Sequence, residues 1–252
     1  VPLVGDGRLA VGEALSTDGA STARIAVGRI GTAEVGPGSR VRLVRSSGTE
    51  HRLALDRGSM HARIWAPPRF FLVETPSALA VDLGCVYTLE VDEQGVGVLA
   101  VQSGQVELVQ RDRRSLVTAG TAAAMRPGSG PGTPFPVSSS PQFRTALAAL
   151  DAGAADSAAL ELVLREAVGQ GTISLWHLLP RVEGEARARV YARLALLSPP
   201  PRGVTRDGVM ELDRRMLAEW KSALEPAWSN EKVALWRTVW RALWSSITEP
   251  DE

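Results

Sequence analysis

The sequence has a single cysteine, Cys85, among its 252 residues, and aromatic residues make up only 5% of the chain. One cysteine excludes an internal disulfide and a metal cluster built on several cysteine ligands. Basic and acidic residues are equal in number, 28 each, so no overall charge draws the chain toward nucleic acid or an anionic membrane. No apolar run reaches about 18 residues, so the sequence predicts no membrane span.

Motifs for catalysis and for cofactor binding are also missing. The three histidines, His51, His61 and His177, show none of the spacings that place two ligands on one metal ion. No P-loop, no nucleophile elbow and no glycine-rich dinucleotide motif occurs. The sequence therefore predicts no catalytic residue, no metal site and no cofactor. An enzyme would require His51, His61 or Cys85 to meet in one cleft.

The two halves of the chain differ in composition, and this difference predicts an α+β protein of two segregated domains. Residues 1–126 are rich in Gly, Val and Thr and alternate apolar with polar positions, which predicts an all-β domain: a sandwich or a short solenoid-like stack of hairpins. Residues 127–141 are rich in Pro, Gly and Ser and predict a linker. Residues 142–252 are rich in Ala, Leu, Glu and Arg, with apolar residues every three or four positions, which predicts an all-α helical bundle.

Four segments of the first half repeat one pattern, in which alternating apolar residues flank a central glycine. Glycine adopts the positive φ angles of turns and bulges, and the recurrence of one unit predicts stacked hairpins that close into a sandwich, a barrel or a short solenoid. The segments are 23–35, 51–64, 97–109 and, more weakly, 113–125.

The second half predicts six helices, each bounded by capping residues, glycine or proline. Their expected ranges are 140–153, 158–168, 172–180, 183–198, 213–226 and 229–247.

Cys85 lies in an alternating run, residues 81–91, whose odd positions are otherwise apolar. Odd positions share one face of an extended strand, so the thiol is expected to point into the core as a small apolar side chain. The carboxylates of Asp82, Glu90 and Asp92 occupy even positions and are expected to face solvent.

The candidates for contact with a partner are aromatic. The last predicted helix places three tryptophans at i, i+4 and i+8 with arginines beside them, and this helix could pack internally, bind a partner or lie in a membrane interface. The candidate partner-binding residues are Trp228, Trp236, Trp240, Trp244, Arg237 and Arg241. In the β half, Trp65 and Phe70 are candidates for stacking on a ligand such as a sugar.

An ordered series of short motifs covers residues 8–123. It comprises GEALST at 12–17 with ARI at 23–25, EVGPGSRVRL at 34–43, LALDRGSMHA at 53–62, FLVETPSALAVDLG at 71–84 and VLAVQSGQVEL at 98–108. In their order and number these motifs resemble the FecR family, the extracytoplasmic domains of bacterial sigma-factor regulators and related envelope proteins.

This resemblance implies a sensory or regulatory module that acts through protein contacts. It implies an extracytoplasmic, periplasmic location, a membrane helix and a sigma-factor-binding region in a part of the protein preceding this sequence, and an envelope or membrane protein as partner. Two departures stand out. Cys85 occupies a position where threonine is common in the family, and a helical domain follows where siderophore-uptake regulators have a small αβ signalling subdomain.

Three classes of function follow from the sequence. The leading expectation is a non-enzymatic, anti-sigma-type envelope regulator that binds neither nucleic acid nor a cofactor. The second is a module that binds a cell-envelope ligand or glycan, for which Trp65 and Phe70 would have to be exposed together. The third is an enzyme built on the histidines and Cys85.

Overall fold

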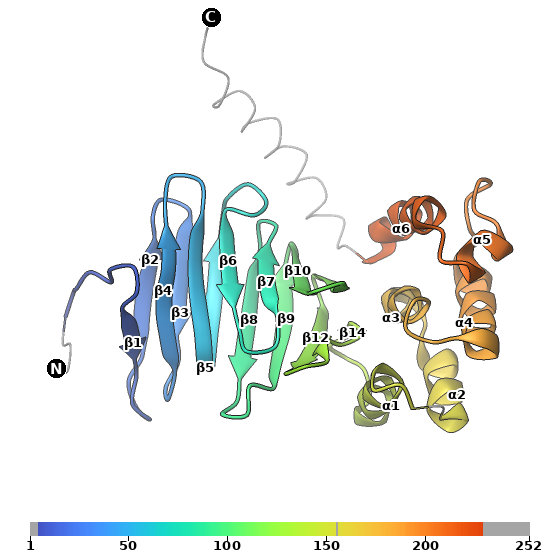
Figure 1. The fold of residues 1–252 in the computed structure, drawn as a ribbon, viewed down its shortest axis with the longest axis horizontal. Helices are drawn as coiled ribbons and strands as arrows, with labels where there is room; N and C mark the ends of the chain where they lie inside the picture. The colour runs from blue at the N-terminus through green and yellow to red at the C-terminus, as the bar shows by residue number, and fades with distance from the viewer. Residues whose placement is uncertain (1–4, 155, 229–252) are drawn as a thin grey trace, which may run out of the picture. The chain divides into compact units, whose positions relative to one another are not determined.

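The computed structural model describes residues 5–154 and 156–228, and it divides the chain into two compact units. Unit 1 contains residues 1–116 and 125–131, and unit 2 contains residues 117–124 and 132–252. Unit 1 is made of strands, and the described helices all belong to unit 2 (Figure 1). The predicted change from a mostly β N-terminal part to a helical C-terminal part is confirmed.

The strands follow the alternating segments of the sequence. They are β1 (Ala14–Ser16), β2 (Ala23–Val27), β3 (Gly31–Val35), β4 (Arg40–Ser46), β5 (His51–Ile64), β6 (Phe71–Glu74), β7 (Leu79–Asp82), β8 (Val86–Val91), β9 (Gly97–Ser103), β10 (Gln105–Gln110), β11 (Arg113–Thr118), β12 (Thr121–Arg126), β13 (Gly130–Pro131) and β14 (Phe135–Pro136).

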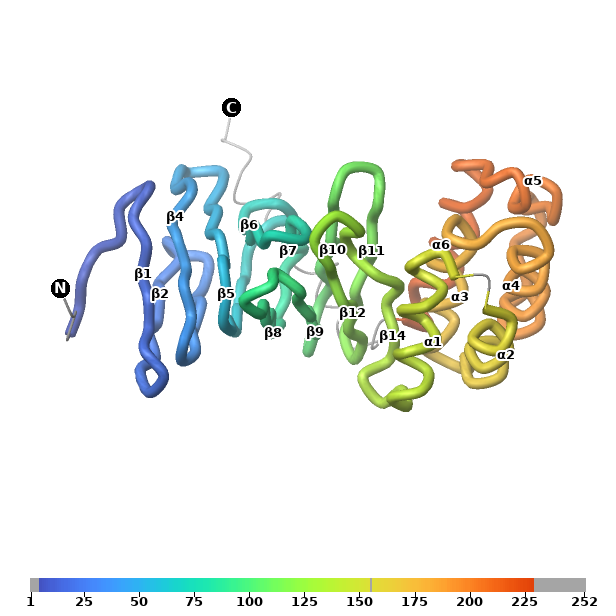
Figure 2. The backbone as a smooth tube through the Cα atoms, turned by 60° about the horizontal axis from the view of Figure 1, so that its bottom comes forward, coloured from blue at the N-terminus to red at the C-terminus, as the bar shows by residue number. Residues whose placement is uncertain are grey.

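Strand β5 joins the two sheets of unit 1. Its first half pairs with β4 and β6 in sheet A, which continues from β6 through β7 to β10 and from β4 to β1. Its second half pairs with β3 and β8 in sheet B, which ends at β2 on one side and continues to β9 on the other. Figure 2 shows β6 and β7 in one layer and β8 and β9 in the other. The apolar core of unit 1 lies between these layers.

Gly58 is the point at which β5 leaves sheet A and enters sheet B. Its φ angle is +93°, a value that side chains disfavour, and a Cβ at this position would overlap Ser39. Ser39 is fully buried, and its Oγ accepts a hydrogen bond from the backbone N–H of Ser59 at 2.9 Å. Gly58 and Ser39 therefore fix the bend together.

The same change of sheet occurs after β7 and after β9. Gly84 (φ +88°) separates β7 in sheet A from β8 in sheet B, and Gly104 (φ +80°) separates β9 in sheet B from β10 in sheet A. The expectation of a hairpin is thus wrong for 51–64 and 97–109, and only 23–35 forms one, as β2 and β3. The glycines do interrupt the regular strands, as predicted. However, a glycine with positive φ can direct the chain into the facing sheet instead of reversing it in a hairpin.

Cys85 is buried, as predicted, with 2% of its surface exposed. It lies beside Gly104, where an added Cβ would approach the Cβ of Cys85 to 2.7 Å, and its carbonyl accepts the N–H of Ile64 at 3.0 Å. Three segments thus meet around this cysteine, and a small side chain is what the space admits.

The prediction that Asp82 faces solvent is wrong, because only 2% of its surface is exposed. The run 81–91 is two strands in different sheets, and the break at Gly84 shifts the alternation by one residue. In β7 the inward positions are therefore even, and Asp82 follows Ala80 into the core. Burial raises the pKa of the Asp82 carboxyl to about 7, although hydrogen bonds from Cys85 and Gly84 oppose the shift. Glu90 and Asp92 are exposed, as predicted.

Unit 2 contains six described helices and one 3₁₀ turn. They are α1 (Pro141–Asp151), α2 (Ser157–Glu166), η1 (Gly169–Gly171), α3 (Thr172–Leu178), α4 (Gly184–Leu197), α5 (Arg206–Met210) and α6 (Arg214–Trp228). Five of the predicted helices are observed within a few residues of their expected ends. Helix α5 was not predicted, and the predicted helix 229–247 lies outside the described residues.

The segment expected as a linker, 127–141, holds β13 and β14, each paired to β12. The part of this segment that belongs to unit 2 is fixed by a buried ion pair. Arg181 donates to Asp151 Oδ1 at 2.8 Å, and the same carboxylate accepts the N–H and hydroxyl of Thr133 at 2.6 and 2.8 Å. Both charged side chains are largely buried, so the hydrogen bonds to Thr133 help offset the cost of removing them from water.

Candidate functional site

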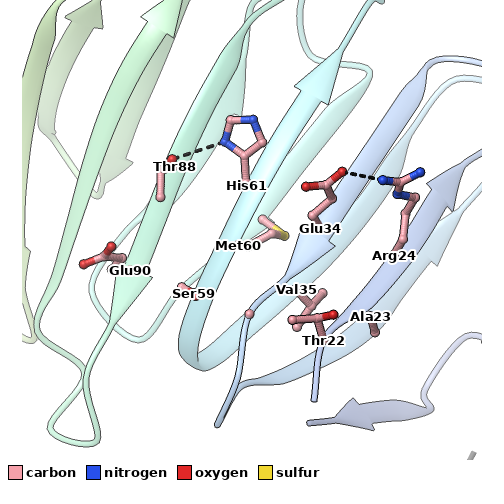
Figure 3. Close-up of a pocket in the computed structure, with 11 residues that line it drawn as sticks. Thr22, Ala23, Arg24, Glu34, Val35, Ser59, Met60, His61, Thr88 and Glu90 are labelled. Atoms are coloured by element: carbon pink, nitrogen blue, oxygen red, sulfur yellow. Dashed lines mark hydrogen bonds and ion pairs between the residues drawn. The ribbon is translucent and has the colours of Figure 1, made fainter. Parts of the chain in front are cut away.

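The outer face of sheet B carries a polar row that runs across four strands. The strand register places Arg24 of β2 beside Glu34 of β3, Glu34 beside His61 of β5, and His61 beside Thr88 of β8. Arg24 donates to Glu34 Oε1 at 2.9 Å, and His61 Nδ1 lies 3.2 Å from Thr88 Oγ1 (Figure 3). Directly cross-strand side chains interact most strongly in a sheet, so this row is held in place by its backbone pairing.

A depression lies beside this row because the neighbouring row contains small residues. Gly36, directly after β3, and Ser59 of β5 are linked by a hydrogen bond of 2.9 Å from the Gly36 N–H to the Ser59 carbonyl. A Cβ on Gly36 would overlap Ser59 Oγ, so a larger residue there would require the serine side chain to rotate. Glu90, paired with Ser59 in the register, closes the far side (Figure 3). This groove has a volume of about 520 Å³ and is lined by Thr22, Ala23, Arg24, Glu34, Val35, Gly36, Ser59, Met60, His61, Thr88 and Glu90.

The charge of the groove is weakly acidic. Glu34 is neutralised in part by Arg24, an exposed ion pair that contributes well under about 1 kcal/mol to stability. Glu90 is exposed and has no ion pair among the described residues. A ligand group entering the groove would therefore meet one unmatched carboxylate, the imidazole of His61 and the hydroxyls of Ser59 and Thr88.

These groups suit recognition better than bond cleavage. A nucleophile–base pair needs hydrogen-bond contact and a third group that orients the base. His61 contacts the hydroxyl of Thr88, and Ser59 lies two residues from it on the same strand, a spacing of about 7 Å. The groove can accept a basic or hydrogen-bonding side chain on a rigid surface.

The three residues required for an enzyme occupy different environments. His61 is in the groove on the outer face of sheet B, whereas Cys85 is buried between the sheets. His51 begins β5, and its Nδ1 lies 3.2 Å from Ser46 Oγ. Within residues 5–154 and 156–228, no group of three or more histidine, cysteine or acidic side chains is arranged to hold a metal ion.

Trp228, a predicted partner-binding residue, belongs to the core of unit 2. It is fully buried, its indole N–H donates to Thr172 Oγ1 at 3.0 Å, and its carbonyl accepts hydrogen bonds of 3.0 Å from Thr118 and Gln170. Its ring packs 5.9 Å from that of Trp176. The prediction of a surface role for this side chain is corrected, because its polar atoms are satisfied inside the unit. The remaining candidates in that set, Trp236, Trp240, Trp244, Arg237 and Arg241, lie outside the described residues.

Trp65 and Phe70, the candidates for ligand stacking, lie in the loop between β5 and β6. Trp65 is 54% exposed, and Phe70 is partly exposed. They are well separated from the groove along β5, since the groove lies at 59–61 and Trp65 follows the end of the strand. The structure therefore assigns them to a second surface of unit 1.

The groove was not identified from the sequence. Its residues come from four strands spread over residues 22–90, and only the strand register shows that they are adjacent. Glu90 was correctly expected on the solvent face, but nothing in the sequence pairs it with Ser59.

Comparisons with known proteins assign no family. No family model matches the sequence, and no curated protein matches it. Two crystal structures of a proposed anti-sigma factor from Parabacteroides distasonis each align at 14% identity with a TM-score of 0.43, over 53% of this chain and 63% of that chain. The chain thus spans less than two thirds of that protein, and a likeness this distant supports no argument about function. No described helix combines the length and apolar character needed to cross a bilayer.

Proposed function

We propose that this chain is a non-enzymatic regulatory module that works through protein contacts, of the type found in FecR-like regulators of sigma factors. The groove on sheet B supports the proposal most directly, because it offers polar recognition groups on a rigid sheet. By the sequence resemblance, the module acts outside the cytoplasmic membrane and communicates with a sigma factor through another part of the protein. The partner contacted by the groove is an envelope protein that presents a basic side chain.

The motifs that resemble the FecR family have structural roles in unit 1, which supports the use of that resemblance for its fold. Thr17 Oγ1 donates to the Gly36 carbonyl at 2.7 Å and accepts the Ser39 N–H at 2.9 Å, which connects the chain before β2 to the turn after β3. Thr75 Oγ1 accepts the N–H of Ala78 at 2.9 Å and so closes the turn between β6 and β7. Such motifs predict a scaffold, and the function must then lie in the outward-facing residues between them.

A complementation experiment tests this proposal. The gene is deleted in the source organism and restored as the wild type, as Glu90→Lys, or as Glu93→Lys, and all transcripts are measured. Glu93 is a matched control, because it is an exposed glutamate in the turn that follows β8 and does not line the groove. Deletion should change the transcripts of one sigma-factor regulon, and wild type and Glu93→Lys should restore them while Glu90→Lys does not.

Two results would contradict different parts of the proposal. Unchanged transcripts in the deletion strain would reject a regulatory role altogether. Full restoration by Glu90→Lys, with protein present at wild-type levels, would reject the groove as the contact site.

The second candidate function, a module that binds an envelope ligand or glycan, is favoured by the exposure of Trp65. An exposed indole is expected where a protein stacks on a sugar ring or lies at an apolar boundary. The residues around Trp65 distinguish between a sugar and an apolar boundary as its ligand.

A further inference from the structure

Trp65 stands at an end of unit 1 where several connections meet. Its backbone N–H donates to the Ile30 carbonyl at 2.7 Å, which joins the β5–β6 loop to the β2–β3 turn. The carbonyl of Phe70, at the end of the same loop, accepts the N–H of His51 at 2.7 Å. The carbonyl of Ala66 would lie 3.4 Å from a Cβ added to Gly84, so the turn between β7 and β8 is adjacent as well. We call this surface the Trp65 end.

Exposure distinguishes Trp65 from the other described tryptophans. It is 54% exposed, whereas Trp220 and Trp228 are fully buried and Trp176 is intermediate. Two prolines follow in the loop, at 67 and 68, and proline restricts backbone freedom in both the free and the bound state. The backbone of the loop that carries the indole is thus restricted before any ligand arrives, which lowers the entropy cost of ordering the loop on binding.

Three arginines in the segments that meet at the Trp65 end have no acidic partners. Arg29 is in the β2–β3 turn, Arg63 is the second-to-last residue of β5 on the same strand face as Trp65, and Arg69 is in the β5–β6 loop. All three are exposed, and none has an ion pair in the part of the chain that the structure describes. Four other arginines in residues 40–69 have acidic partners, whereas Arg57, in β5 just before the bend at Gly58, has none in the described part of the chain.

Two of the matched arginines lie near the start of β5. Arg52 pairs with Glu50 at 2.9 Å and with Glu74 at 3.0 Å, and Arg45 lies 3.9 Å from Glu50. Asp82, the acidic residue nearest Arg69 in the backbone hydrogen bonding, has its side chain in the core. The Trp65 end therefore carries three exposed arginines without ion pairs in the same segments as an exposed indole.

From this geometry we infer that the Trp65 end binds an anionic phospholipid surface, with the indole in the interface and the arginines on the headgroup phosphates. Tryptophan concentrates at membrane–water interfaces, and each basic residue near an anionic leaflet contributes about 1 kcal/mol. Arginine also binds phosphate through two parallel hydrogen bonds. A neutral glycan would leave the three charges unmatched, and the loop offers no second fully exposed aromatic ring for stacking. This contact orients unit 1 on a membrane and is separate from the groove.

Sedimentation with lipid vesicles tests the inference on the purified 252-residue chain. Vesicles of phosphatidylcholine alone are compared with vesicles that also contain phosphatidylglycerol, and a soluble anionic polysaccharide is titrated in parallel. Binding should require phosphatidylglycerol. Arg29→Gln/Arg63→Gln/Arg69→Gln should weaken it by about a hundredfold, from about 1 kcal/mol per arginine, and Trp65→Ala by about tenfold.

The matched control is Arg57→Gln/Arg111→Gln/Arg126→Gln, which removes the same charge from three exposed arginines of unit 1 outside the Trp65 end. This variant should bind vesicles like the wild type, and circular dichroism should show all variants folded. The inference is overturned if the wild type does not distinguish the two vesicles, or if Trp65→Ala and the first triple variant bind as well as the wild type. It is also overturned if the polysaccharide alone binds, which would favour the glycan-binding function.

Discussion

Unit 1 and unit 2 place their polar and aromatic groups in opposite ways. In unit 1 the groups available for recognition, such as Glu90, His61 and Trp65, are on the outside, and the buried hydroxyls fix turns. In unit 2 the described tryptophans, Trp176, Trp220 and Trp228, are largely inside, and Trp228 forms hydrogen bonds to segments far away in the sequence. The comparison supports the proposal that the β unit displays the binding surfaces, whereas the described helices bury most of their large aromatic side chains.

The first prediction concerns the bend on which unit 1 depends, and it has the largest expected effect. Gly58→Ala places a Cβ against Ser39 and requires a disfavoured φ, so unit 1 should lose more than about 4 kcal/mol of stability or fail to fold. Gly128→Ala is the control, because its φ is also positive but no atom lies within 4 Å of its added Cβ. That variant should lose only about 1 kcal/mol. Urea unfolding of both variants checks the difference, and equal losses would contradict it.

The second prediction compares a buried with an exposed tryptophan. Trp228→Ala should destabilise unit 2 by about 3–5 kcal/mol, because it leaves a cavity and removes the partner of Thr172. Trp65→Ala should change the stability of unit 1 by less than about 0.5 kcal/mol. Hydrogen exchange followed for peptides of each unit separates these effects. If Trp228→Ala leaves the exchange of unit 2 unaltered, Trp228 is not part of its core.

The third prediction is that lowering the pH changes the stability of the two units in opposite directions. Burial raises the Asp82 pKa to about 7 from 3.8, so folded unit 1 binds more protons than the unfolded chain between these values, and its stability falls as pH rises from about 4 to 7. Burial and the nearby Arg181 charge lower the His177 pKa to about 3 from 6.5, so unit 2 loses stability as pH falls below about 6.5. Each effect is on the order of a few kcal/mol.

Two variants isolate these contributions. Asp82→Asn should remove the loss of unit 1 stability between pH 4 and 7, and His177→Gln should flatten the acid sensitivity of unit 2. The measurement is urea unfolding across this pH range, monitored by hydrogen exchange in each unit after correction for intrinsic rates. Unchanged slopes in the variants would show that other groups dominate the pH dependence.

The smallest effect is expected at Cys85. Cys85→Ala removes one buried sulfur from the place where Gly104 and Ile64 meet, and the loss should be about 1 kcal/mol. The variant should regulate transcription like the wild type in the complementation experiment. Loss of regulation by a folded Cys85→Ala protein would give the thiol a functional role.

Local patterns predicted much of the fold. Alternation located the strands, capping residues located five helices, and glycines marked the breaks in the β half. What a glycine does at a break depends on which strands it faces, so Gly58 was expected in a hairpin and is found in a bend between sheets. The same change of sheet shifts the alternation after β7, and this is why Asp82 is buried.

Long-range contacts explain what the sequence did not predict about the sites. The groove requires the register of β2, β3, β5 and β8, none of which is encoded in local spacing. Trp228 was grouped with the aromatic residues that follow it, whereas its hydrogen bonds to Thr118, Gln170 and Thr172 place it in the core. Trp65 was recognised as a surface candidate, but Arg29 belongs to the same surface only because the β2–β3 turn is hydrogen-bonded to the loop after β5.

Crosslinking at the groove tests the central claim, that unit 1 regulates through a protein bound on sheet B. A photoreactive residue is placed at Thr88, inside the groove, or at Glu93, outside it, in the full-length protein in its own cells. The account predicts a defined protein adduct from position 88, its loss when Glu90→Lys is added, and no such adduct from position 93. The absence of an adduct from position 88, or the same adduct from both positions, would contradict it.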